Sequence, residues 1–93
     1  MTTAIMAEFV KVDQENVIAV LKEAGRDLAK AEREVVVDCS SLEWVDSAIV
    51  KALQEIADTA DRAGVKVGLR SVNIGVYKVL KLVRLAERFF FVA

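Results

Sequence analysis

Hydrophobic and polar positions along the chain alternate between the periods of strands and of amphipathic helices. Residues Ile5 to Val12 and Val65 to Arg70 have the pattern of strands, and the unbroken run Val35 to Val37 is typical of a central strand covered on both faces. Phe89 to Val92 predicts a last short strand. Helical spacing predicts three core stripes between these strands: Val17, Val20, Leu21, Ala24, Leu28 and Ala31; Ile49, Ala52, Leu53, Ile56, Ala57, Ala60 and Ala63; Val76, Val79, Leu80 and Val83.

The resulting order, β-α-β-α-β-α-β, is that of an α/β domain. Strands joined through helices connect by right-handed crossovers, so we expect a mostly parallel or mixed sheet of about four strands with helices packed against it. Candidate helix caps follow the same order: Asp13, Asp46 or Ser47, and Ser71 or Asn73 at N-termini, and Gly64 at a C-terminus. Nothing in the composition divides the chain, and residues 1–93 are expected to form one domain.

The composition restricts the chemistry that the chain can perform. With 55% hydrophobic residues, 29% charged residues and a net charge of −1, no general attraction to nucleic acid follows. The absence of histidine and the single cysteine, Cys39, leave no imidazole base, no internal disulfide, and no metal or cofactor to expect. No segment reaches the roughly 18 apolar residues of a membrane span, so we expect a cytoplasmic protein without direct membrane insertion.

A distinctive pattern lies between the second strand and the second helix: Asp38-Cys39-Ser40-Ser41-Leu42-Glu43-Trp44-Val45-Asp46-Ser47. A strand that ends in Asp, a Ser two residues later, and an apolar pair before Asp-Ser at a helix start resemble the signature of STAS domains. This is the family of bacterial anti-anti-sigma factors and related modules. The similarity covers roughly Val35 to Val92 and implies a STAS-type domain that binds a partner protein and is not an enzyme.

The resemblance assigns a regulatory role to Ser47, because the matching serine of the family is phosphorylated by an anti-sigma-factor kinase. A phosphate in the first turn of a helix is stabilised by free N–H groups and by the helix dipole. It also adds about −1.5 to −2 charges beside Asp46, which would repel an acidic partner surface and block close packing. The resemblance implies the following partner-binding residues: Asp13, Ser40, Trp44, Asp46, Ser47, Ala48 and Ile49.

The chain departs from the family pattern at three places. Ala48 and Ile49 stand where the family has Ser or Thr and then Gly, and Lys11 reverses a charge in the turn before Asp13. The residues up to Val12 have room for one strand where the family has two, so the first family strand is expected to be short or missing. A sheet edge would then be unpaired and would favour a homodimer.

Other interpretations of the same residues remain open. Asp46 and Ser47 are common helix caps, and Trp44 fits half-buried packing as well as it fits a partner anchor. Four basic residues could form either a solvated helix face or a surface for an acidic partner: Lys78, Lys81, Arg84 and Arg88. Cys39 is expected to be a small core residue.

Two other classes of function compete with a phosphorylation switch. A constitutive adaptor subunit, which binds the ATPase of a phospholipid-transport ABC system or belongs to a signalling scaffold, would need the STAS fold but no modifiable serine. An enzyme would have to work with the residues around one loop: Asp38, Glu43, Asp46 and Ser47. The usual catalytic motifs are absent.

Overall fold

The computed structural model describes residues 8–31 and 34–92 of the chain. Its elements are β1 (Glu8–Asp13), α1 (Val17–Ala31), β2 (Val35–Ser41), α2 (Ser47–Ala63), β3 (Val67–Arg70), α3 (Ile74–Leu82), a short 3-10 helix (Ala86–Arg88) and β4 (Phe90–Val92). The predicted α/β class and the order of strands and helices are confirmed. The part of the predicted first strand before Glu8 lies outside the described residues.

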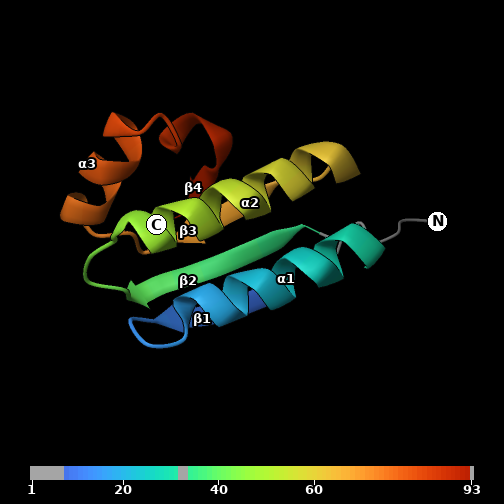
Figure 1. The fold of residues 1–93 in the computed structure, drawn as a ribbon, viewed down its shortest axis with the longest axis horizontal. Coiled ribbons are helices and arrows are strands. Elements are labelled where there is room, and N and C mark those ends of the chain that lie inside the picture. The colour runs from blue at the N-terminus through green and yellow to red at the C-terminus, as the bar shows by residue number, and fades with distance from the viewer. Residues whose placement is uncertain (1–7, 32–33, 93) are drawn as a thin grey trace.

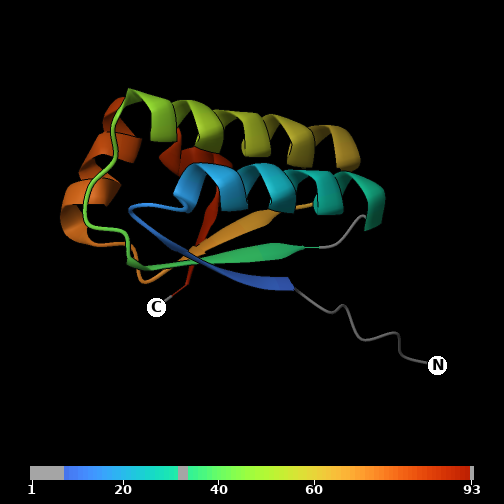
Figure 2. The same ribbon diagram turned by 60° about the horizontal axis from the view of Figure 1, so that its bottom comes forward.

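The four strands form one parallel sheet in the order β1-β2-β3-β4. When consecutive parallel strands are neighbours, right-handed crossovers place every connecting helix on the same face. Figures 1 and 2 show α1 and α2 side by side over one face of the sheet. α3 lies on this side as well, where Tyr77 packs edge-on against Phe91 of β4 with 5.3 Å between ring centroids.

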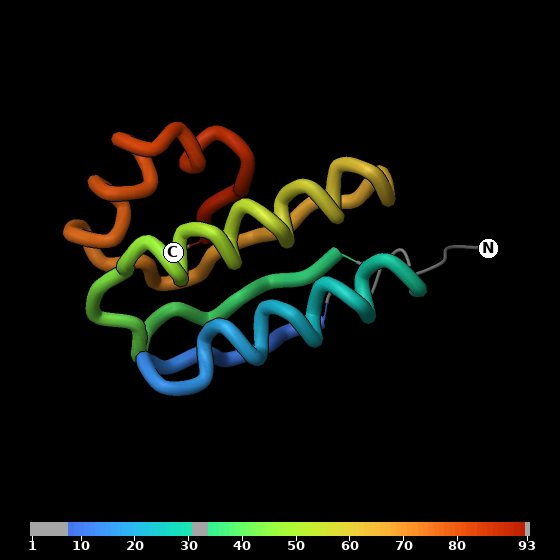
Figure 3. The backbone as a smooth tube through the Cα atoms, in the orientation of Figure 1, coloured from blue at the N-terminus to red at the C-terminus, as the bar shows by residue number. Residues whose placement is uncertain are grey.

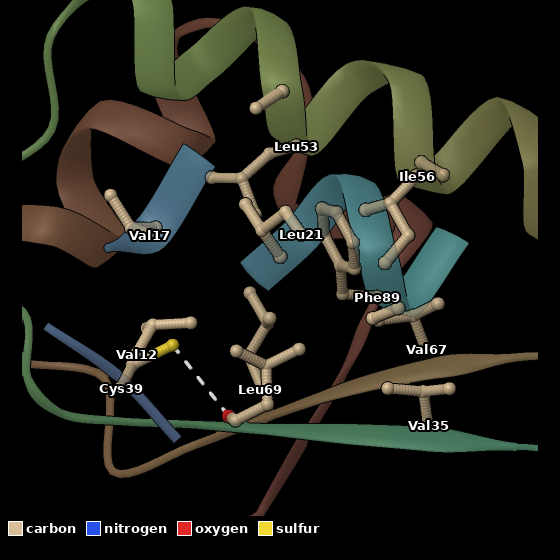
Figure 4. Packing of buried hydrophobic residues seen from close by; sticks show 14 of the residues in the cluster. Val12, Val17, Leu21, Val35, Cys39, Leu53, Ile56, Val67, Leu69 and Phe89 are labelled. Atoms are coloured by element: carbon tan, nitrogen blue, oxygen red, sulfur yellow. Dashed lines mark hydrogen bonds between the residues drawn. The ribbon is translucent and has the colours of Figure 1, made fainter. Parts of the chain in front are cut away.

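The hydrophobic core fills the space between the helices and this face of the sheet. Alternate residues of the strands point toward the helices, as Figure 4 shows for Val35 and Cys39 of β2 and for Val67 and Leu69 of β3. The helices contribute the predicted stripes, which include these fully buried side chains: Leu21, Leu28 and Leu80. Val83 does not belong to the core, because α3 ends at Leu82 and leaves Val83 40% exposed.

The opposite face of the sheet carries no helix among the described residues, as Figure 2 shows. The run Val35 to Val37 is buried on both faces of β2, as its pattern predicts, although no described helix lies on the side of Val36. Val36 points to this open face, and it is only 4% exposed although it lies outside the core cluster. The run of valines therefore has the pattern of a doubly covered strand because all three side chains are buried.

Two element boundaries differ from the sequence expectation for local reasons. Asp13 does not cap α1: its Oδ1 accepts hydrogen bonds from the N–H groups of Glu15 (2.9 Å) and Asn16 (2.8 Å), which forms a turn before the helix begins at Val17. β3 begins at Val67 rather than Val65, because the Val65 N–H still bonds to the Ala60 carbonyl (3.0 Å) and closes the end of α2.

Substitution by alanine should have opposite effects at two of the glycines, Gly64 and Gly25. Gly64 ends α2 in the left-handed region with φ 71°, so Gly64→Ala should lower the free energy of unfolding by about 1 kcal/mol. Gly25 lies inside α1, and an added Cβ would meet Ile56 Cγ1 at an ordinary 3.9 Å. Gly25→Ala should therefore stabilise the fold by about 0.5–1 kcal/mol. Urea unfolding of both variants tests these signs, and a stabilising Gly64→Ala would contradict the left-handed cap.

Candidate functional site

The loops that follow β1, β2 and β3 gather at one end of the molecule. Because the strands are parallel, their carboxyl ends share one edge of the sheet, and in open α/β sheets this edge is the usual place for binding sites. Figure 3 shows the connection before α1 and the connection before α2 side by side at this edge. The segment predicted to carry function, from Asp38 to Ser47, lies in the middle of the three loops.

Gln14, in the turn after β1, holds the β2–α2 loop by its side chain. Its Nε2 donates to the carbonyl of Trp44 (2.9 Å), and its Oε1 accepts from the N–H groups of Glu43 (3.0 Å) and Trp44 (3.3 Å). One amide group thus satisfies three backbone groups of a loop that has no regular structure of its own. Sequence reasoning missed Gln14, because a polar residue in a turn gives no signal that identifies its distant partner.

Asn73, before α3, holds the same loop from the other side. Its Nδ2 donates to the carbonyls of Leu42 (3.2 Å) and Glu43 (3.0 Å), while its Oδ1 accepts from the Val76 N–H (2.8 Å) and caps α3. Asn73 was expected only as a helix cap, and the structure gives it this second contact. The β2–α2 loop is therefore fixed to both neighbouring loops before any partner binds.

α2 begins at Ser47 and is capped by Asp46. The Asp46 Oδ1 accepts from the N–H of Ile49 at 2.9 Å, and the backbone of Asp46 is extended, as an N-cap requires. The cap is thus made by Asp46, and the exposed hydroxyl of Ser47 is not used for it. The first turn of α2 itself contains no acidic residue, so the capping carboxylate of Asp46 is the negative charge that faces the positive end of its dipole.

Four predicted partner-binding residues are exposed together at this helix start: Trp44, Asp46, Ser47 and Ala48. We call them the Ser47 surface. Trp44 is 53% exposed although the backbone on which it stands is fixed by Gln14, so it projects from a rigid support. Ile49 is 3% exposed and lies in the core, in agreement with its place in the predicted helix stripe. Its prediction as a contact residue is wrong.

The other two predicted contact residues have local structural roles. Asp13 supports the turn that carries Gln14, as described above. Ser40 donates its N–H to Asp38 Oδ1 at 2.9 Å. Hydrogen bonds from the Ser40 backbone and side chain, and then the positive charges of Lys11 and Arg70, lower the pKa of Asp38 below its usual value. Asp38 is therefore a carboxylate at neutral pH.

The basic residues near α3 do not form one continuous surface. Lys78, Lys81 and Arg84 are exposed, whereas Arg88 bonds to Asp58 (2.8 Å) and Asp61 (2.6 Å) of α2. The chain reverses at Arg84, which has a positive φ of 62°, and this turn carries Arg88 away from the other three. Arg88 therefore links the C-terminal segment to α2.

Cys39 is a core residue, as expected. Burial, with a smaller contribution from Asp38, raises the pKa of its thiol to about 12, and its Sγ donates to the Val37 carbonyl at 3.6 Å. The dashed line in Figure 4 marks this contact. Among the described residues, no group of three or more acidic or cysteine side chains is placed to hold a metal ion, and no helix has the length and hydropathy to cross a membrane.

The elements and their parallel order define a small α/β domain. The family model described as "Mlab, STAS domain" matches residues 12–92, so the chain belongs to the STAS domain family. The crystal structure of TM1081 from Thermotoga maritima, described as a candidate anti-sigma factor antagonist, is similar with a TM-score of 0.69 and 21% identity over 91% of this chain and 71% of that chain.

An NMR structure of TM1081 gives a TM-score of 0.76 and 17% identity over 98% of this chain and 77% of that chain. Identities this low establish a shared fold rather than a shared partner. A comparison with curated proteins found no match.

Loss of either side chain that fixes the loop should loosen it. Gln14→Ala and Asn73→Ala should each lower the free energy of unfolding by about 1–3 kcal/mol. Each substitution removes three hydrogen bonds to backbone groups, and one such bond contributes about 1 kcal/mol. The amides of Glu43 and Trp44 should exchange with solvent roughly tenfold faster in Gln14→Ala. Hydrogen exchange followed by NMR measures this. Gln54→Ala, an exposed glutamine on α2, is the matched control and should change neither quantity.

The raised pKa of Cys39 predicts a pH effect of known sign. In the unfolded chain the thiol ionises near 9.0, whereas in the folded protein it does so at about 12. Its contribution to stability is thus complete below pH 9 and is lost as the pH rises toward 12. The unfolding free energy of the wild type should fall more steeply over this range than that of Cys39→Ala. Equal slopes, or rapid labelling of the native thiol at neutral pH, would contradict its burial.

Proposed function

We propose that this protein is an anti-sigma factor antagonist-like regulatory STAS domain whose Ser47 surface binds a partner protein under control of Ser47 phosphorylation. The observation that carries the proposal is the exposed hydroxyl of Ser47 in the first turn of α2, beside a capping residue that leaves it free. The expected partner is an anti-sigma factor with serine kinase activity. Bacterial cytoplasm is the compartment that fits this role.

The surroundings of Ser47 support phosphorylation that changes partner binding without destabilising the fold. A phosphate on Ser47 would lie at the positive end of α2, where backbone N–H groups are available, so the domain tolerates it. The same phosphate would stand beside the carboxylate of Asp46, the preceding residue. Repulsion from an acidic partner, and the cost of removing water from the phosphate, would both oppose close packing.

Trp44 supports a contact surface next to the switch. A large aromatic side chain that is half exposed can fill a pocket on a partner, and such residues dominate binding energy at interfaces. Because Gln14 and Asn73 already hold its loop, little conformational entropy is lost when a partner binds. Binding would therefore use a preformed surface.

A constitutive adaptor is the second candidate function. Ala48 stands beside Ser47 in place of the family's Ser or Thr, and the matching family model is described as "Mlab, STAS domain". In this role the Ser47 surface would bind the ATPase subunit of a phospholipid-transport ABC system, without regulation by phosphate.

Binding measurements on Ser47 variants separate the two functions. The partner is first recovered by co-purification, and its affinity is then measured by isothermal titration calorimetry. Ser47→Asp should weaken binding by about tenfold or more, because it places a negative charge beside Asp46. Ser47→Ala, and Gln54→Glu as a matched charge control on the same helix, should stay within about threefold of the wild type. Equal affinities for Ser47→Asp and Ser47→Ala would contradict the switch and favour the adaptor.

A further inference from the structure

The open face of the sheet is a surface that the proposed function leaves unused. Parallel sheets occur almost only with both faces covered, because both faces of their strands carry apolar side chains. In the part of the chain that the structure describes, α1, α2 and α3 all lie on the other side (Figure 2). The open face should therefore have an occupant.

The strand register arranges the side chains of this face in two level rows. The first row is Phe9, Val36, Gly68 and Phe90, and the second is Lys11, Asp38, Arg70 and Val92. Phe9 is 66% exposed. The ring of Phe90 lies over Gly68, where a Cβ would approach its Cζ to 2.5 Å. One row is thus apolar throughout, and the row beside it carries alternating charges.

We propose that this face docks on the same face of a second copy of the chain, about a twofold axis that runs parallel to the strands between β2 and β3. This rotation exchanges β1 with β4 and β2 with β3. It places Asp38 opposite Arg70 of the second copy, and Arg70 opposite its Asp38. It also places Phe9 opposite Phe90, so apolar row meets apolar row, and it places Lys11 opposite Val92 at the edge strands, where the Lys11 ammonium can reach water. The interface is isologous and closes as a dimer.

The pattern of the two rows selects this axis. A twofold axis that runs across the strands, between the rows, would place Asp38 on Val36 of the second copy and Arg70 on Gly68, whereas Lys11 faces an apolar residue about either axis. Charged side chains would then lose water without gaining a partner, which is unfavourable. The axis along the strands instead gives each Asp38 a third cation, in addition to the Lys11 and Arg70 that flank it within its own sheet. Sheets packed in this way lie about 10 Å apart.

The area of the open face limits the affinity expected between two copies of the chain. Four strands about 4.8 Å apart span roughly 20 Å, and two rows of side chains cover less than the roughly 800 Å² per partner of a standard interface. We therefore expect a weak, reversible dimer with a Kd of about 10–500 μM. The dimer buries the sheet face and leaves α2 outside, so both Ser47 surfaces remain accessible. This inference goes beyond the proposed function, and its failure would leave that function standing.

Exchange of charges between two variants tests the interface directly. Asp38→Arg places Arg opposite Arg70 in a homodimer, and Arg70→Asp places Asp opposite Asp38, so each variant alone should self-associate at least about tenfold more weakly than wild type. In an equimolar mixture both contacts become attractive, and association should return to within about threefold of wild type. Analytical ultracentrifugation from about 5 to 500 μM measures all four samples. Contacts within one chain cannot produce this recovery.

Two further variants and one measurement on the unmodified chain complete the test. Phe9→Ser should weaken association about tenfold, whereas Leu82→Ser, at an 83% exposed position on α3, should leave it unchanged. In a dilution series of the wild type, NMR signals of Phe9, Asp38 and Arg70 should shift, and those of α3 should not. A wild type that remains monomeric at about 1 mM would overturn the proposal, as would a mixture that fails to recover or a Leu82→Ser variant that dissociates.

Discussion

The four strands pair in parallel, and each lies beside the strand that follows it in the sequence, in the order β1-β2-β3-β4. This pairing determines where the core, the open face and the candidate site lie. Right-handed crossovers between neighbouring parallel strands can place the helices only on one face of the sheet. The core then forms on that face, the opposite face stays open, and the loops after β1, β2 and β3 meet at one edge. The Ser47 surface and the open face are both consequences of this single topology.

The Ser47 surface combines a rigid support with a modifiable group. Gln14 and Asn73 come from loops on either side and satisfy backbone groups of the β2–α2 loop, so the loop needs no secondary structure to be ordered. Asp46 caps α2, and Ser47 is left exposed. Chemical change at Ser47 can therefore alter the surface without removing an interaction on which the fold depends.

The sequence predicts the elements and the motif well, because both are encoded by residues close in the chain. Helical stripes and strand runs depend on local periodicity, and the Asp38–Ser47 pattern is contiguous. Periodicity indicates that a residue is buried but not what covers it, so Val36, which is buried without a described helix on its side of the sheet, has the pattern of a residue under a helix. The cap made by Asn73 is local and was expected, whereas the contacts of Gln14 and Asn73 with the β2–α2 loop were missed because their partners are about thirty residues away.

We propose that the Ser47 surface at the start of α2 binds the partner in the conformation it already has in the free chain. NMR chemical-shift mapping of the labelled chain during titration with the co-purified partner tests it most directly. We expect the largest chemical-shift changes on residues 44–48, and we expect them to disappear when Ser47 is phosphorylated. Changes confined to α1 or to the open face of the sheet, with residues 44–48 unaffected, would contradict it.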